Sequence, residues 1–178
     1  MLAAMDELVI RRLEPGDLAD HLDGLAAVLA DCVAGGASVS YMAPFTHADA
    51  RTAFEGFAAD AGRGGRLILA AFDGGRLVGT VQVVHAAPPN QPHRADIAKL
   101  LVHRDVRRRG IAERLMVAAE AEARAAGKTL LVLDTVTGDA AERLYERIGW
   151  TRVGVIPNYA LYPDGRSCAT TVFFKALD

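Results

Sequence analysis

A basic turn that contains a glycine, between a predicted strand and a predicted helix, is the segment of this sequence best suited to bind a ligand. It consists of Arg107, Arg108, Arg109, Gly110, Ile111 and Ala112. The start of a helix presents unpaired backbone N–H groups and the positive end of the helix dipole, and both favour an anion. Gly110 and Ala112 leave room for phosphates to approach the backbone. The turn predicts a site for a phosphorylated ligand, and a basic surface turn before an ordinary helix is the alternative.

Two aspartates are candidates for acid–base chemistry. Asp96 and Asp134 each lie within or at the end of an apolar predicted strand, where a carboxylate is unusual. Loss of hydration favours the protonated form of a carboxylate, which suits it to accept a proton as a general base. Structural explanations exist for both residues, because Asp134 could cap the following turn and Asp96 could pair with Arg94 or Lys99.

Tyr145 is the candidate for a general acid. It lies in a predicted helix that starts at Asp139. A phenol ordinarily titrates at about pH 10, so it donates its proton near neutral pH only where the geometry helps. The apolar neighbours Leu144 and Ile148 favour the alternative of a tyrosine that serves only the core.

Length and composition narrow the class of protein. The 178 residues, 51% hydrophobic and 24% charged, suit a single domain over residues 1–178 with a sizeable core. The net charge of −2 gives no broad basic surface for nucleic acid. No apolar run approaches the roughly 20 residues that cross a bilayer. The N-terminus lacks the pattern of a secretion signal, so we expect a cytoplasmic protein.

Metal and disulfide chemistry are not expected. Cys32 and Cys168 are far apart in the sequence and belong to no CxxC or Cys/His cluster, and the five histidines show no ligand spacing. This pattern predicts neither a disulfide framework nor a bound metal.

Hydrophobic periodicity and breaking residues predict the elements that position these groups. A continuous apolar run at residues 130–133 predicts a strand buried on both faces. Glu122 lies on the apolar face of the helix expected over residues 111–126, and predicts that the C-terminal end of this helix is less buried. The expected strands cover residues 7–13, 67–72, 77–84, 94–102, 130–133, 150–156 and 169–175, and the expected helices cover 18–34, 46–62, 111–126 and 139–149.

This order of elements resembles the GNAT (N-acetyltransferase) superfamily. The acetyl-CoA motif of that family is Arg or Gln, two residues, Gly, one residue, then Gly or Ala, and Arg107, Gly110 and Ala112 match it. A second motif, Ala-x-x-x-Tyr in the next helix, is matched by Ala141 and Tyr145. The resemblance implies an α/β fold with a mixed, mostly antiparallel sheet that is splayed at its centre and flanked by helices.

Two positions depart from the family pattern. Arg108 stands where many members have glycine, and Gly138 stands where many have asparagine. Neither departure removes the phosphate site. The second leaves open which group hydrogen-bonds the pantetheine arm or the substrate at that point.

The resemblance also implies site residues. The co-substrate is acetyl-CoA, without a metal, and a backbone N–H at Leu101 or Val102 would polarise the thioester carbonyl. Tyr145 would lie near the sulfur of coenzyme A. The implied contacts of acetyl-CoA are Leu100, Leu101, Val102, Arg107, Arg108, Arg109, Gly110, Ile111, Ala112, Ala141 and Tyr145.

A narrower resemblance is to the tabtoxin-resistance acetyltransferases, which acetylate the amino group of a β-lactam amino-acid toxin. It is carried by residues 35–42, 94–100, 133–135 and 151–166. In those enzymes, acidic residues that match Asp96 and Asp134 are proposed to act on the amine.

We therefore expect an acetyl-CoA-dependent N-acetyltransferase of a small amine. The alternatives are a protein or peptide acetyltransferase, a non-catalytic acyl-CoA-binding module, and nucleic-acid binding through residues 104–109, against which the negative net charge argues. Residues 35–45, 86–93 and 158–166 are expected to select the acceptor. A homodimer is consistent with the superfamily.

Overall fold

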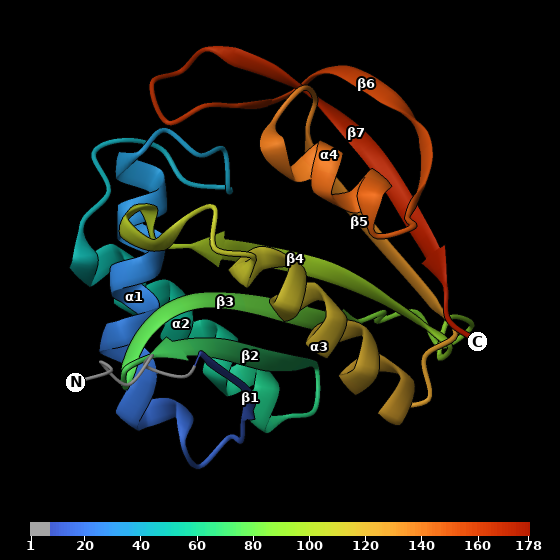
Figure 1. The fold of residues 1–178 in the computed structure, drawn as a ribbon, viewed down its shortest axis with the longest axis horizontal. Helices are drawn as coiled ribbons and strands as arrows, with labels where there is room; N and C mark the ends of the chain where they lie inside the picture. Colours follow the sequence, from blue (N-terminus) through green and yellow to red (C-terminus); the bar gives the residue numbers. More distant parts are fainter. Residues whose placement is uncertain (1–7) are drawn as a thin grey trace, which may run out of the picture.

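The computed structural model describes residues 8–178 and is built around a seven-stranded mixed sheet in the order β1-β2-β3-β4-β5-β7-β6 (Figure 1). The four α-helices and one short 3-10 helix of residues 8–178 connect the strands. The strands are β1 (Val9–Leu13), β2 (Arg66–Asp73), β3 (Arg76–His85), β4 (Arg94–Val102), β5 (Leu130–Val136), β6 (Thr151–Leu161) and β7 (Ser167–Ala176). The helices are α1 (Leu18–Ala34), α2 (His47–Gly62), η1 (Arg104–Val106), α3 (Ile111–Ala125) and α4 (Ala140–Arg147).

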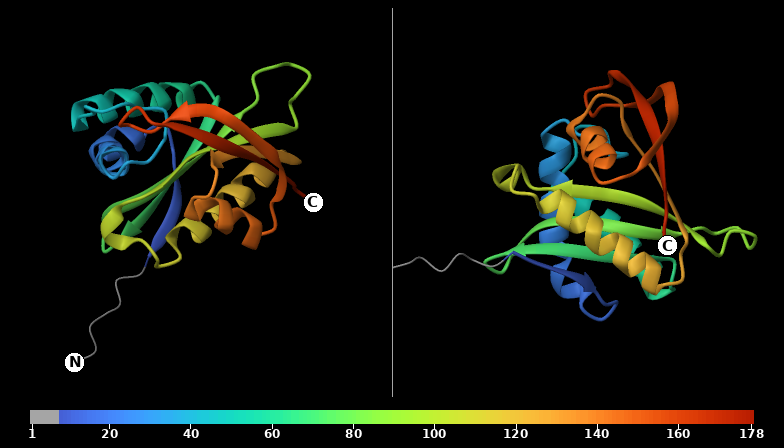
Figure 2. Two further views of the ribbon diagram at one scale, coloured as in Figure 1. Left: turned by 90° about the horizontal axis from the view of Figure 1, so that it is seen from above. Right: turned by 45° about the vertical axis from the view of Figure 1, so that its right-hand side comes forward.

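Helices cover both faces of the sheet. The side chains of α1 and α2 pack on one face of β2, β3 and β4, whereas α3 packs on the other face of these strands (Figure 2). The helix α4 lies on the same side of the sheet as α3 and packs against β5 and β7. Alternate residues of β2 therefore enter different cores: Ile68 belongs to the core beneath α1, and Leu69 to the core beneath α3. This arrangement makes β2 and β3 the strands that are buried on both faces.

The expectation that residues 130–133 are buried on both faces is wrong. In β5, Leu131 and Leu133 are buried in the core beneath α3, whereas Leu130 and Val132 are half-exposed and Asp134 is exposed. The physical reason is that α1 and α2 cover β2, β3 and β4 but do not extend over β5. Asp134 lies on the uncovered face of β5 and is therefore exposed to solvent.

The central feature of the sheet is a short parallel contact between β4 and β5. Only Arg94, Ala95 and Asp96 pair with β5, opposite residues 130–132, while the other strand pairs are antiparallel. After Asp96 the two strands diverge, and Figure 1 shows the gap widening from the end near the C-terminus. This confirms the expected mixed and centrally splayed sheet.

A β-bulge interrupts β4 beside this divergence. Gln82 pairs with Ala98 and Thr80 with Leu101, so two residues of β4, Lys99 and Leu100, lie opposite a single residue of β3. Lys99 adopts a positive φ of 52°, which is uncommon for a residue with a side chain. The extra residue reverses the alternation of β4. Ile97 therefore packs beneath α3, whereas Leu101 packs beneath α1.

Other boundaries differ modestly from the predicted ones. Both β6 and β7 are longer than expected, η1 was not expected, and Glu7 lies outside the described residues.

The far end of α3 is buried, since Ala119 and Ala123 are inaccessible to solvent, so the expectation from Glu122 is wrong. Glu120 lies on the buried face instead, where Lys175 and Trp150 satisfy its carboxylate.

Candidate functional site

The start of α3 is an uncapped helix N-terminus beside the end of β4. Gly110 occupies the N-cap position with φ 73° and ψ 7°, and no side chain accepts a hydrogen bond there from the first backbone N–H groups. Arg108 also has a positive φ, 62°. Left-handed residues in such a turn direct neighbouring N–H groups into one concave surface, which favours an anion. The turn has the geometry expected of a phosphate site.

The three arginines of the turn have different environments. Arg109 forms an ion pair with Asp73 at the end of β2, at 2.6 Å, and this contact holds the pKa of Asp73 below its usual range. Arg107 folds back, and its Nε donates to the carbonyl oxygen of Val102 at 3.2 Å. Within residues 8–178, the side chain of Arg108 makes no hydrogen bond or ion pair. Two of the three predicted charges are thus engaged by the protein, and Arg108 is available to a ligand.

The backbone of β4 has an open edge after the divergence. The N–H of His103 donates to the carbonyl of Val78 at 2.9 Å, so the backbone groups of His103 point toward β3. Leu101 lies two residues earlier and pairs with Thr80, so its backbone groups also point toward β3. By the alternation of a strand, Leu100 and Val102 direct theirs away from β3. Of the two expected N–H donors, this geometry favours Val102. The side chain of Leu101 is buried beneath α1.

Asp134 lies in β5 on the exposed face of the sheet, which is the face that α3 does not cover. Its Oδ2 is 2.8 Å from the hydroxyl of Thr170 on β7, a hydroxyl that is also 2.9 Å from the carbonyl oxygen of Thr135. Because β5 continues to Val136, Asp134 does not cap a turn, and that alternative is wrong. The expected loss of hydration is also absent, since Asp134 is exposed.

Asp96 shares this face but has a different partner. Its register mate is Val132, which has the same orientation in β5 as Asp134. Asp96 forms an ion pair with Arg94, and its side chain is 43% exposed. The pairing with Arg94 is one of the two structural alternatives expected for this residue, so Asp134 is the freer of the two carboxylates.

Tyr145 lies on α4 with its ring in the core. The ring is 5.8 Å from Phe173 and 6.0 Å from Trp150, between centroids, and the residue is 5% exposed. Its hydroxyl has no hydrogen-bond partner in residues 8–178, yet it is not among the fully buried unsatisfied atoms. Burial, assisted by the charge of Asp134, raises the pKa of Tyr145. The hydroxyl is therefore protonated, and no group of residues 8–178 engages it.

The start of α4 differs from the start of α3. The Glu142 carboxylate accepts the N–H of Gly138 and lies 2.9 Å from the Thr171 hydroxyl, and these contacts lower the pKa of Glu142. The Glu142 carboxylate thus already binds the backbone N–H of Gly138, the residue that stands where many family members have asparagine. Ala141 is half-buried and packs against the core that holds Tyr145.

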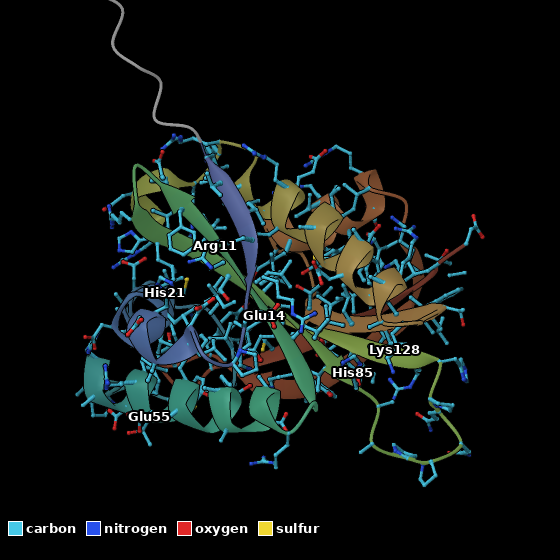
Figure 3. The ribbon with its side chains drawn as sticks, turned by 90° about the horizontal axis from the view of Figure 1, so that it is seen from below. Arg11, Glu14, His21, Glu55, His85 and Lys128 are labelled. Carbon is cyan, nitrogen blue, oxygen red and sulfur yellow. The ribbon has the colours of Figure 1, made fainter. Side chains whose placement is uncertain are left out.

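Two of the three segments expected to select the acceptor lie together. Ser38 donates to the carbonyl of Leu161 at 2.7 Å, and the N–H of Ala43 donates to Pro163 at 3.0 Å, so residues 35–45 contact residues 158–166. The third segment, residues 86–93, projects from the closed end of the divergence (Figure 2), and Figure 3 shows His85 and Lys128 at its base. Lys128 holds this loop through the carbonyl of Pro92 at 2.7 Å.

Sequence reasoning did not identify Lys99 as a site residue. It lies at the bulge beside the divergence, and its Nζ is 3.0 Å from the Ser40 hydroxyl. A lysine inside an apolar strand was the available signal, but the bulge that orients it depends on the pairing of β3 with β4.

The described residues hold neither a metal-binding cluster nor a membrane-spanning helix. Residues 8–178 contain no group of three or more His, Cys, Asp or Glu side chains placed to hold a metal ion. Among the helices of the same residues, none is both long enough and apolar enough to cross a membrane.

The uncapped helix start and the diverging strands together have the geometry expected of a protein that binds a phosphorylated ligand beside β4. Residues 27–150 match the model of the acetyltransferase (GNAT) family. This chain belongs to that family.

Solved structures share the fold over nearly the whole chain. An N-acetyltransferase from Staphylococcus aureus Mu50 aligns with a TM-score of 0.80 at 20% identity, covering 97% of this chain and 99% of that one. An acetyltransferase of the GNAT family from Streptococcus pneumoniae gives 0.76 at 23% identity, covering 96% and 99%. The structure of yncA from Salmonella typhimurium with its cofactor acetyl-CoA gives 0.77 at 20% identity, covering 97% and 95%.

Proposed function

We propose that this protein is an acetyl-CoA-dependent N-acetyltransferase that transfers the acetyl group directly to the amine of a small molecule. The observation that carries the proposal is the divergence of β4 from β5, with the uncapped start of α3 at its open end and with Asp134 and Tyr145 near it. Membership of the GNAT family supports the reaction class, and an acetyl-CoA complex of a protein with the same fold supports the co-substrate.

The residues present fit acetyl-CoA. The backbone N–H groups that follow Gly110 would hold its pyrophosphate, and Arg108 would add a positive charge. The open edge of β4 at Leu100 offers backbone groups to the amide-containing pantetheine arm, and the Val102 N–H would face the thioester. The remaining predicted contacts (Leu101, Arg107, Arg109) would support the site through packing, through the Val102 carbonyl and through Asp73, respectively.

Three groups would act on the reacting atoms. The N–H of Val102 would stabilise negative charge on the thioester oxygen, a kind of contact typically worth about 3 kcal/mol in the transition state. Asp134 would accept a proton from the amine, directly or through water, so that the amine can attack. The Tyr145 hydroxyl would donate to the departing sulfur. Asp96 is the second candidate for the base, although its pairing with Arg94 makes it less available.

A small acceptor is favoured over a protein segment. Residues 35–45 and 158–166 contact each other through Ser38 and Ala43, which leaves less room for an extended chain on that side. The resemblance to tabtoxin-resistance enzymes involves these same segments and supports an amino-acid-like toxin or antibiotic as the acceptor. A protein or peptide amine, or acyl-CoA binding without catalysis, is the competing function.

Two further expectations accompany this proposal. A homodimer is supported by β6, an edge strand that exposes several apolar side chains, and light scattering would test it. These side chains are Val153, Val155, Ile156, Tyr159 and Leu161. A cytoplasmic location suits an enzyme that consumes acetyl-CoA.

The experiment is thiol release from acetyl-CoA with separate panels of amino acids, aminoglycosides and peptides, together with the mass of each acceptor. We expect one small amine to gain a single acetyl group as thiol is released. Acetylation confined to peptides would contradict a small-molecule acceptor and support the protein or peptide acetyltransferase. Tight acetyl-CoA binding without transfer to any panel member would support the non-catalytic module.

A further inference from the structure

Lys99 is a mostly covered cation at the bulge of β4, beside the point where β4 leaves β5. Its Nζ lies 3.0 Å from the Ser40 hydroxyl and 5.7 Å from the centre of the Tyr41 ring. Both contacts come from the segment that joins α1 to α2. The positive φ of Lys99 shows that the backbone accommodates this residue in an unfavourable conformation. The lysine is thus held toward the acceptor side of the sheet by polar and aromatic groups that carry no charge.

The surroundings of Lys99 are short of negative charge. In residues 8–178, no carboxylate forms an ion pair with it. Burial lowers the pKa of Lys99, the positive charge of Arg66 lowers it further, and the charge of Asp134 acts in the opposite sense. A partly buried cation without a counter-ion is costly.

The neighbouring cation Arg66 does have its partners. Its Nε is 2.6 Å from Asp60, and another of its nitrogens is 2.7 Å from Oε1 of Gln82. The amide nitrogen of Gln82 is fully buried and has no hydrogen-bond partner. Asp60 is therefore committed to Arg66 and does not neutralise Lys99.

We infer that Lys99 binds a carboxylate of the acceptor, so that the substrate is an amine that also carries an acid, such as an amino acid. This inference rests on the proposed acetyl transfer. The acceptor carboxylate would lie against Lys99, where it would supply the missing counter-ion. Its amine would lie toward Asp134, which would remain free to accept a proton. Lys99 is in this account a specificity-determining residue and takes no part in the chemical step.

The test compares amino acids with their carboxamides, which keep the side chain and the amine but lack the carboxylate. Thiol release gives kcat/KM for each pair in the wild type and in Lys99→Met. Arg124→Met is the matched control, because Arg124 is an exposed cation in the last turn of α3 and lies outside the segments expected to select the acceptor. Thermal unfolding verifies that each variant is folded.

We expect the wild type to prefer the acid, and Lys99→Met to lower kcat/KM for the acid by about tenfold or more through KM, with kcat and the carboxamide little affected. Arg124→Met should keep the wild-type ratio. An acid-to-amide ratio that is unchanged in Lys99→Met, or acetylation only of amines without an acid, would overturn the inference while leaving the acetyltransferase function intact. Acetyl-CoA binding without transfer to any amine would overturn both.

Discussion

Thr170 on β7 places its hydroxyl 2.8 Å from Oδ2 of Asp134 on β5, and so orients the carboxylate that we propose as the base. Asp134→Asn keeps the shape of the side chain and removes its ability to accept a proton. We expect kcat/KM to fall by about 10²–10⁴ with acetyl-CoA affinity near the wild-type value. Steady-state kinetics on the acceptor, with calorimetry on acetyl-CoA, measure the two effects.

Asp96→Asn is the matched control for that experiment, because Asp96 shares the same face but pairs with Arg94. We expect it to cost much less than Asp134→Asn. The loss in Asp134→Asn should shrink at high pH, where more of the amine is already neutral. Equal losses in both variants would make the pair of carboxylates the functional unit, and near-full activity in both would remove a carboxylate base from the mechanism.

Tyr145→Phe separates the two roles of that residue. The ring contacts with Phe173 and Trp150 remain, so thermal stability should change little. If the hydroxyl assists the departing sulfur, turnover should fall by about tenfold or more, with acetyl-CoA affinity nearly unchanged. Single-turnover rates, where chemistry limits the reaction, provide the measurement. A wild-type rate in this variant would leave Tyr145 as a packing residue.

The pH profile gives a second measurement on Tyr145. Burial and the charge of Asp134 raise the pKa of Tyr145, so its phenol loses its proton only above the usual range of about 10. The wild type should therefore show no loss of activity from Tyr145 ionisation up to about pH 10. A decline below that pH that is absent from Tyr145→Phe would contradict the raised pKa.

The buried ion pair between Glu120 and Lys175 gives a prediction about the stability of the core. Lys175 Nζ is 2.8 Å from the Glu120 carboxylate, which is also bonded by the Trp150 indole at 3.0 Å. Lys175→Met would leave a buried carboxylate without its cation, and we expect a loss of about 3 kcal/mol in the free energy of unfolding. Urea denaturation measures this loss.

The exposed pair Arg147–Glu113, at 3.2 Å, provides the control. Arg147→Met should cost less than about 1 kcal/mol, because solvent screens that pair. The double variant Glu120→Gln with Lys175→Met should recover part of the stability by removing the unpaired charge. Similar losses in Lys175→Met and Arg147→Met would show that the Glu120 pair contributes no more than a surface pair.

The sequence predicted the elements well because local patterns determine them. Helical spacing in α1, the Thr46 cap of α2 and the glycine before α3 all depend on neighbouring residues, and the resulting helices start within a residue of the expected positions. The burial of β5 could not be predicted in this way. An apolar run has the same appearance whether one or both faces are covered, and the coverage depends on where α1 and α2 pack.

The site was predictable to a similar extent. The turn at Gly110 was identifiable because glycine and arginine occur at fixed spacing next to a helix start. The engagement of Arg109 by Asp73 and the orientation of Lys99 toward Ser40 and Tyr41 depend on long-range pairing of β2, β3 and β4. Residue type alone therefore did not separate the anchoring arginine from the available one.

Calorimetric titration of acetyl-CoA into Gly110→Glu and Gly110→Ala tests the central claim most directly. Any side chain at this residue is strained by its φ of 73°, so the alanine variant measures that strain, while glutamate adds a negative charge at the helix start. We predict that Gly110→Glu, while still folded, binds acetyl-CoA about tenfold or more weakly than Gly110→Ala. Equal affinities in two folded variants would contradict the placement of the pyrophosphate at the start of α3.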